Sequence, residues 1–359
     1  MRKCGGQDPS ARRLARCRGT IFRDIMKTSA ARPGNRIAVT WGDPSGIGPE
    51  VIIKALAYIP PSLRKRITVF GDPDHMNRLS RHLKSRVSIT GASDERGGPD
   101  AVAVVKAASF PFDPGKMGKV SKSAGQAAMT ALEAALAQVL KGQFASMVTA
   151  PISKEAVNRA GYIIAGHTEF LAERCGGAPV AMMLASRKLK VVVATTHVAL
   201  RDLPRLLDRK KLHDLILLVS RSVKQYGIAQ PRIAVCGLNP HASDGGLFGD
   251  EEMTIIAPAI RSARRAGALV TGPHPADTMF TPRARMNYDV AIAMYHDQGL
   301  IPVKALSFGE TVNVTLGLPF LRVSVDHGTA FDIAGKAVAD ERPMVHAIKT
   351  AARMLKGRF

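Results

Sequence analysis

The sequence has few aromatic residues, no long apolar segment and no paired cysteines, and each of these lacks argues against a class of protein. Aromatic residues make up only 5% of the chain, too few for the stacking platforms of single-stranded nucleic-acid binders. No apolar run approaches the roughly 18 residues that a membrane-spanning helix needs. The four cysteines are scattered without a CxxC pair, which argues against a disulfide framework or a thiolate zinc site. We therefore expect a protein of the reducing cytoplasm, with no membrane partner.

Acidic residues are also scarce, because 29 Asp and Glu stand against 51 Lys and Arg and give a formal net charge of +22. Such an excess can indicate nucleic-acid binding. However, residues 1–36 hold ten Lys or Arg and two Asp, and so carry +8 of the total. We interpret residues 1–36 as a basic, disordered N-terminal extension, with an Arg-rich transit peptide as the alternative. The rest of the chain has no basic cluster interleaved with aromatics, so we expect no nucleic-acid partner and consider anionic small substrates a better fit.

Apolar runs alternate with helical patterns along the remaining chain. Apolar residues recur every four positions over residues 124–140, and a second helical pattern over residues 210–227 ends in a glycine. Most of the runs between such helices are apolar on both faces, as expected for strands that helices cover on two sides. This alternation predicts an α/β protein with a largely parallel sheet. The expected strands are residues 36–42, 67–71, 145–150, 180–186, 189–196, 232–237 and 289–295.

Three histidines occupy the same kind of position relative to these strands. His197, His241 and His296 each lie at or just beyond the carboxyl end of an apolar run. Because the carboxyl ends of parallel strands lie along one edge of a sheet, the three imidazoles can converge there. Any one of them alone is more simply a structural histidine, but neutral imidazole is a common ligand of divalent metals. The shared position therefore favours a metal site.

Further segments suit a ligand. Residues 40–56 read as a strand, a Gly-rich turn and a helix, and the turn is either structural or a backbone cradle for a ligand. No GxGxxG fingerprint is present, so an ordinary Rossmann site is not expected. His167 and Thr168 lie at a predicted helix start, where Thr168 can act as a cap and His167 suggests substrate contact. Lys154 stands early in another helix, where the helix dipole disfavours a cation unless an anionic ligand lies nearby.

Nine segments resemble one family in sequence and in order. Over residues 37–355 the chain resembles the 4-hydroxythreonine-4-phosphate dehydrogenases of pyridoxal phosphate biosynthesis. That resemblance implies two α/β/α domains of the isocitrate/isopropylmalate dehydrogenase-like type with a cleft between them. Residues 37–145 and 300–359 would form the first domain, and residues 146–299 the second, with the metal site and dimer contacts. The segments are GDPSGIGPE, TAPISKEAV, GHTEF, MMLAS, ATTHVALRDLP, CGLNPHASDGG, PADTMF, MYHDQGLIPVK and VNVTLGLPFLRVSVDHGTAFDIAGK.

The resemblance also implies roles for individual residues. The family binds a divalent metal through histidines that match His197, His241 and His296, and zinc, magnesium and cobalt are all candidates. It is a homodimer whose active site is completed across the subunit interface. The residues that match its substrate contacts are His167, Thr168, Lys304, Asn313 and Arg322.

A Gly-rich loop is the expected NAD site. The segment HGTAFDIAGK resembles the nucleotide loop of isopropylmalate and isocitrate dehydrogenases, in which an Asp at the position of Asp332 goes with NAD. Such a carboxylate can accept hydrogen bonds from ribose hydroxyls. Phe331 departs from those relatives, which often carry Pro there. The expected cofactor contacts are His327, Gly328, Thr329 and Asp332.

The implied reaction is the NAD-dependent oxidation of 4-phosphooxy-L-threonine at its C3 hydroxyl, after which the β-keto acid loses CO2 to give 3-amino-2-oxopropyl phosphate. A divalent ion on the hydroxyl oxygen lowers its pKa, and Lys304 and Arg322 can hold phosphate or carboxylate. The general base is open among Asp277, Asp297 and Lys304, and we take Lys304 as the hypothesis. The alternatives are a paralogous dehydrogenase of 4-phospho-D-threonate, 4-phosphoerythronate or a cis-dihydrodiol acid, and a metal-dependent hydrolase, which would need no dinucleotide loop.

Overall fold

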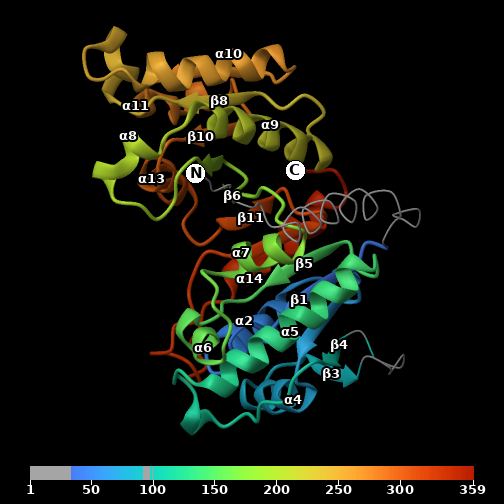
Figure 1. The fold of residues 1–359 in the computed structure, drawn as a ribbon. Coiled ribbons are helices and arrows are strands. Elements are labelled where there is room, and N and C mark those ends of the chain that lie inside the picture. Colours follow the sequence, from blue (N-terminus) through green and yellow to red (C-terminus); the bar gives the residue numbers. More distant parts are fainter. Residues whose placement is uncertain (1–33, 92–97, 99) are drawn as a thin grey trace, which may run out of the picture.

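One continuous sheet runs through the described part of the molecule, with helices on both faces (Figure 1). The computed structural model describes residues 34–91, 98 and 100–359, so most of the predicted extension lies outside the described residues. The strand order is β3-β4-β2-β1-β5-β12-β11-β6-β7-β10-β8-β9. The strands are β1 Ile37–Thr40, β2 Ile67–Gly71, β3 Ser88–Gly91, β4 Ala101–Lys106, β5 Ser146–Thr149, β6 Ala181–Ala185, β7 Lys190–Val193, β8 Ile233–Cys236, β9 Val270–His274, β10 Val290–Ala293, β11 Val312–Leu316 and β12 Leu321–Val325.

Local sequence explains where the long helices begin and end. The Ser121 hydroxyl caps α5 and the Asp208 carboxylate caps α9, each by accepting a backbone N–H of the first turn. Gly227, just past α9, has a φ of 113°, and a Cβ there would come 2.0 Å from the Gly357 oxygen. The helices are α2 Gly48–Tyr58, α3 Pro61–Arg64, α4 Pro73–His82, α5 Lys122–Leu140, α6 Lys154–Arg159, α7 His167–Arg174, α8 Leu203–Leu206, α9 Arg209–Gln225, α10 Ala257–Arg265, α11 Ala276–Met279, α12 Pro282–Arg285, α13 His296–Ser307 and α14 Arg342–Met354, with shorter turns η1 Pro114–Lys116, η2 Leu200–Asp202, η3 Pro240–Gly246 and η4 Glu252–Ile256.

The sheet consists of two parallel sets joined by antiparallel strands. β11 runs antiparallel to its neighbours β12 and β6, and β6 runs antiparallel to β7. All other pairs of neighbouring strands are parallel. The set from β3 to β12 therefore points one way, and the set of β7, β10, β8 and β9 points the other. The strands of both predicted domains form one continuous sheet, so the sheet itself shows no boundary between them. The predicted domain bounds therefore stay a prediction.

Alternate residues of the second set enter different cores, as a sheet with both faces covered requires. Val192 of β7 packs in the large core that includes Ile216 of α9. Val191 and Val193 pack in a second core with Val303 of α13. Helices α9 and α13 therefore cover opposite faces of this set, while α5, which contacts β1 and β2, and α14, which contacts β12 and α2, cover the first set.

The structure confirms the predicted α/β class, the seven predicted strands and the two predicted helices, with bounds shifted by at most three residues. Strands β3, β4, β9, β11 and β12 were not predicted. Among the described residues, no helix is both long enough and apolar enough to cross a lipid bilayer.

Candidate active site

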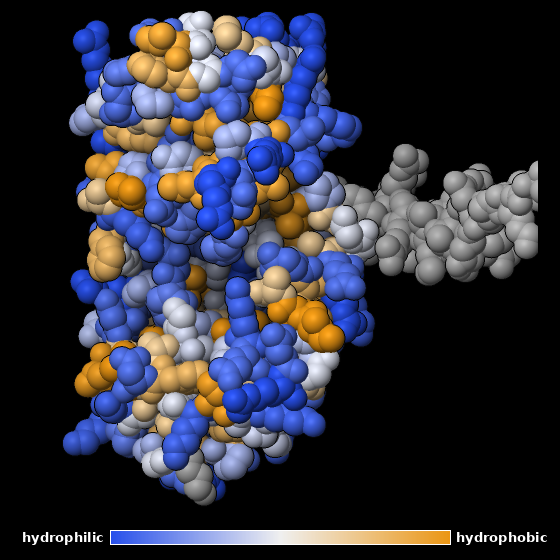
Figure 2. Space-filling view, turned by 60° about the vertical axis from the view of Figure 1, so that its left-hand side comes forward, coloured by the Kyte–Doolittle hydropathy of each residue, from blue (hydrophilic) through white to orange (hydrophobic). Residues whose placement is uncertain are grey.

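A cleft of about 660 Å³ lies beside the central strands, where the two parallel sets meet. It is within the size range of substrate and cofactor pockets. Figure 2 shows the surface hollowed between the two ends of the elongated molecule. Side chains from β5, α6, α7, β11 and β12 line the cleft, together with the segments after β7 and β12. The strands of both sets therefore contribute to one site.

A buried guanidinium dominates one wall of this cleft. Arg322 on β12 is 3% exposed and donates to the hydroxyls of Thr149 at 2.7 Å, Thr315 at 2.9 Å and Thr168 at 3.3 Å. Burial lowers its pKa to about 10, although the charge of Glu169 raises it. Among the described residues no carboxylate lies within ion-pair distance of Arg322, and its Nε is buried without an acceptor. A buried cation without a counter-charge is costly, and an anionic ligand would remove that cost.

His167 lies beside Arg322 at the start of α7. Its Nε2 is buried without a hydrogen-bond partner. Burial lowers the pKa of His167 well below its usual value, and the charge of Arg322 lowers it further, so the imidazole is neutral. The prediction that Thr168 caps this helix is wrong, because the cap position is Gly166 and carries no side-chain hydrogen bond. Thr168 instead accepts a hydrogen bond from Arg322.

Two more polar groups in the cleft lack partners. The Oδ1 atom of Asn313 on β11 and the Nε2 atom of His327 after β12 are buried and make no hydrogen bond. Lys154, the first residue of α6, also lines the cleft, together with Gly328. Buried polar atoms are normally satisfied, so the unpaired atoms of Arg322, His167, Asn313 and His327 together indicate a polar ligand site.

Lys304 lies next to the cleft on α13. Its Nζ is 3.2 Å from Oδ2 of Asp326, and both side chains are only partly exposed. Asp326 directly follows β12 and precedes His327, so the ion pair fixes α13 to the loop that lines the cleft. Of the other two candidates for the general base, Asp277 in α11 is exposed, and exposed Asp297 pairs with Nδ1 of His296 at 2.7 Å.

The predicted nucleotide loop packs against the Gly-rich turn between β1 and α2. The N–H of Ile47 donates to the Thr329 carbonyl at 3.0 Å, and a Cβ on Gly46 would lie 2.8 Å from that oxygen. This contact requires glycine at position 46. Asp332 is exposed in the same loop. The structure thus brings the two Gly-rich segments singled out in the sequence side by side.

The three histidines follow three adjacent parallel strands, β7, β10 and β8. His197 and His296 lie together, with ring centroids 5.6 Å apart. His241 lies exposed in the η3 turn after β8, with a φ of 53°. Within the described residues of one chain, no group of three His, Cys, Asp or Glu side chains could hold a metal. The strand-end placement is confirmed, while a shared metal stays a prediction that needs further ligands.

Two polar side chains that the sequence analysis did not single out hold these strand ends in place. Gln298 accepts from the Met294 N–H at 2.6 Å and donates to the Gly237 carbonyl at 2.8 Å, which joins the ends of β10 and β8. The buried carboxylate of Glu252 accepts the N–H groups of Leu238 and Asn239 at 2.7 Å each, just before His241. Both contacts fix the backbone that carries the histidines.

Comparison with known proteins places this architecture in a family. Residues 63–351 match the family described as "Pyridoxal phosphate biosynthetic protein PdxA". The chain is 46% identical over 320 residues to the 4-hydroxythreonine-4-phosphate dehydrogenase of Beijerinckia indica, with 89% of this chain and 94% of the relative covered. It is 41% identical over 336 residues to the "Putative D-threonate 4-phosphate dehydrogenase" of Bradyrhizobium diazoefficiens, with 89% and 97% covered.

Solved structures agree with these matches. The crystal structure of 4-hydroxythreonine-4-phosphate dehydrogenase from Klebsiella pneumoniae has a TM-score of 0.79 at 40% identity, with 90% of this chain and all of that chain covered. A terephthalate 1,2-cis-dihydrodiol dehydrogenase from Burkholderia xenovorans has a TM-score of 0.63 at 34% identity, with 89% and 97% covered. The chain therefore belongs to the PdxA family of pyridoxal phosphate biosynthetic proteins.

Proposed function

We propose that this protein is an NAD-dependent dehydrogenase of pyridoxal phosphate biosynthesis. It would oxidise 4-phosphooxy-L-threonine at C3 to a β-keto acid, which loses CO2 to give 3-amino-2-oxopropyl phosphate. The main structural support is Arg322, which is buried in the cleft, has no carboxylate partner among the described residues and lies among other polar atoms that lack hydrogen bonds. Its support from comparison is the 46% identity to a 4-hydroxythreonine-4-phosphate dehydrogenase over nearly the whole chain.

The cleft offers a separate partner for each part of this substrate. Arg322 binds the phosphate or the carboxylate, and the guanidinium geometry favours two-point contact with either. Asn313 Oδ1 can accept from the substrate ammonium or hydroxyl, and the neutral His167 can donate without adding charge. We take Lys304 as the proton acceptor for the C3 hydroxyl, a role that requires its neutral amine, and its contact with Asp326 at 3.2 Å holds the side chain beside the loop. NAD would lie along the loop of His327, Gly328, Thr329 and Asp332.

The histidines fit a divalent ion by their chemistry. His197 and His296 present adjacent imidazoles at the ends of neighbouring strands, and imidazole suits zinc and cobalt among other metals. When bound, such an ion would polarise the oxygen at C3 of the alcohol and of its ketone product. Because His241 is not grouped with this pair in one chain, we propose that a second copy of the chain supplies it.

Exposed apolar residues on the histidine-bearing segments support a homodimer. Leu200, three residues after His197, is 67% exposed; Leu247, in the turn after His241, is 72% exposed; and Ile301 on α13 is 65% exposed. Large apolar side chains clustered on a surface commonly mark an interface. A two-fold contact through these segments would cover them and bring histidines of two copies together.

Complementation tests the shared site. His197→Ala and His241→Ala should each be inactive. If each site takes His197 from one copy and His241 from the other, then mixing and re-associating the two variants restores about a quarter of wild-type activity, because half of the dimers are mixed and each has one intact site. The matched control is a mixture of His197→Ala with His296→Ala, which should stay inactive. Failure of the first mixture, with mixed dimers present, would refute sharing.

The reaction itself is tested by following NADH formation with 4-phosphooxy-L-threonine, with and without a chelator. We expect turnover with NAD that the chelator abolishes and an added divalent metal restores. Lys304→Met should abolish turnover while metal binding, measured by titration, survives. No NAD reduction with this substrate would refute the assignment, and chelator-insensitive turnover would refute the metal.

A second candidate is the oxidation of 4-phospho-D-threonate or its erythronate analogue by the same machinery. The 41% identical relative named for D-threonate 4-phosphate supports it, as Arg322 would hold either substrate. The ratio of kcat/KM values for the L-threonine and D-threonate phosphates decides between them.

A further inference from the structure

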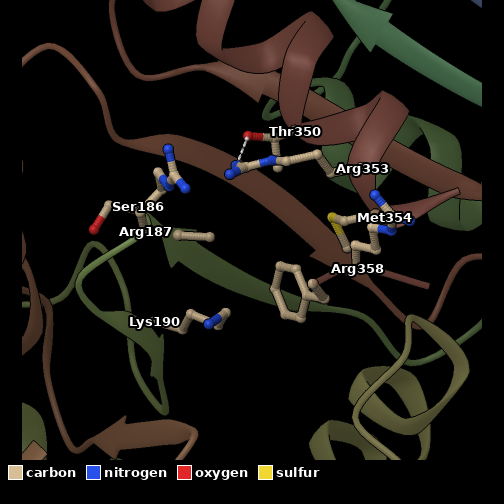
Figure 3. Close-up of a pocket in the computed structure, with 9 residues that line it drawn as sticks. Ser186, Arg187, Lys190, Thr350, Arg353, Met354 and Arg358 are labelled. Atoms are coloured by element: carbon tan, nitrogen blue, oxygen red, sulfur yellow. Dashed lines mark hydrogen bonds between the residues drawn. The ribbon is translucent and has the colours of Figure 1, made fainter. Parts of the chain in front are cut away.

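A second cationic cavity lies away from the catalytic cleft, between the β6–β7 turn and the end of α14 (Figure 3). It has a volume of about 180 Å³, which is small compared with the cleft. Arg187 and Lys190 come from the turn and the start of β7, and Arg353 comes from the last turn of α14. Arg358, Ser186 and Thr350 complete the polar lining, and no carboxylate side chain lines the cavity.

The cations in this cavity act on one another. Burial lowers the pKa of Lys190, and the charge of Arg353 lowers it further. Burial likewise lowers the pKa of Arg353, and the charge of Arg187 adds to the effect. Protonated side chains are thus held close together and partly out of water, an arrangement that needs a compensating anion.

The described residues supply little compensation. No carboxylate among them lies within ion-pair distance of Arg187, Lys190, Arg353 or Arg358. Asp289 favours the charged form of Lys190 from further away, but its two oxygens are bound by Arg232 at 3.2 and 3.0 Å. The ring of Phe359 lies 4.9 Å from Nζ of Lys190 and offers a cation–π contact.

Arg353 also has spare hydrogen-bonding capacity. One terminal nitrogen donates to the Thr350 hydroxyl at 3.0 Å, while its Nε is buried without an acceptor. In Figure 3 the side chains of Arg187, Lys190 and Arg353 surround one opening. Two guanidinium groups and an ammonium around a small cavity match the oxygens of a phosphate group, which accepts from several donors at once.

We propose that this cavity is a second anion site, which binds a phosphate group carried either by inorganic phosphate or by a small phosphate ester. It is separate from the cleft, because it lies at the Ala185 end of β6 and the cleft lies at the Ala181 end. The proposal does not depend on the reaction assigned to the cleft, since it rests on different residues.

The test is calorimetric titration of the whole chain in a chloride buffer, with inorganic phosphate and separately with glycerol 3-phosphate. Wild type is compared with Lys190→Gln/Arg353→Gln and with Arg81→Gln, an exposed arginine on α4. We expect one site per chain to weaken roughly ten- to hundred-fold in the double variant, as loss of hydrogen bonds to a charged group predicts. Arg81→Gln should bind like wild type.

Two controls keep the result interpretable. Arg187→Gln changes an exposed side chain, so it should fold normally and still weaken the same site. In the phosphate-free chloride buffer the double variant should melt no earlier than wild type, because it loses charge repulsion. Tighter binding of the ester than of inorganic phosphate would identify a phosphorylated metabolite as the ligand, and the reverse would identify free phosphate. Equal isotherms for wild type, Arg187→Gln and the double variant would overturn the proposal.

Discussion

Replacing Arg322 by Met should leave the protein folded and still remove most of its activity. The guanidinium is 3% exposed and donates to three threonine hydroxyls. Losing three hydrogen bonds costs about 3 kcal/mol of unfolding free energy at about 1 kcal/mol each. The variant no longer buries an unpaired cation, which costs several kcal/mol. The two effects nearly cancel, and the stability should change by no more than about 2 kcal/mol.

Activity has no such cancellation. Loss of a buried charge contact to an anionic substrate costs about 2–5 kcal/mol, and about 1.4 kcal/mol corresponds to a factor of ten. The kcat/KM should therefore fall about thirty-fold to a few thousand-fold. Thermal melting and steady-state kinetics of the purified variant measure the two quantities separately.

Arg64→Met is the matched control, because Arg64 is equally buried but is paired. It donates to the Leu56 and Ile59 carbonyls at 2.7 and 3.1 Å and pairs with Asp100. The variant would leave the Leu56 and Ile59 carbonyls without this donor, at about 1–3 kcal/mol for each buried acceptor left unsatisfied, so it should melt earlier while its folded fraction keeps a normal kcat/KM. If Arg322→Met instead lost as much stability as Arg64→Met and its folded fraction kept normal kinetics, Arg322 would be a structural residue and the ligand argument would fail.

Three further predictions concern other parts of the molecule. Burial raises the pKa of Asp43 from 3.8 to about 6, so the folded state binds a proton more tightly than the unfolded chain. Between pH 8 and pH 5 the unfolding free energy of wild type should therefore rise by about 1.4 kcal/mol relative to that of Asp43→Asn, as measured by denaturant titration. A difference that does not change with pH would contradict the raised pKa. Gly46→Ala should displace the Thr329 loop, because its Cβ would lie 2.8 Å from a backbone oxygen. The KM for NAD should then rise several-fold more than the KM for substrate. Equal rises in the two KM values would show that this loop does not bind the cofactor. Gln298→Ala should weaken metal binding about ten- to hundred-fold, as loss of a contact that supports a metal ligand does. An unchanged metal affinity, measured by titration, would show that the contact between β10 and β8 does not position the histidines.

The sequence was sufficient to predict those strands that are buried on both faces. Strands such as β1, β8 and β10 are completely buried, and a continuous apolar run is what two covered faces demand. Strands β11 and β12 were missed because Asn313, Thr315, Arg322 and Ser324 interrupt their apolar pattern. Strand β9 contains Gly272 and Pro273, which read as a turn.

The sequence likewise predicted some residues of the cleft and missed others. His167, Asn313, Arg322 and His327 could be placed by family resemblance, and the structure brings all four to one cleft. Thr149 and Thr315 were missed, although each is a polar residue that interrupts the apolar pattern of its strand, which is the signal that could have found them. Gln298 and Glu252 act through backbone contacts between distant segments, and no local sequence pattern reports such contacts.

The polar residues that hid β11 and β12 from prediction are those that build the cleft. Arg322 and Thr315 are register partners on adjacent antiparallel strands, as are Ser324 and Asn313, so all four side chains project from one face of the sheet. Placing polar side chains there sacrifices apolar packing at the centre of the molecule, where it would stabilise the fold most. The described chain keeps a cation there without a carboxylate to pair it, and this conflict between stability and residue choice is typical of a functional site.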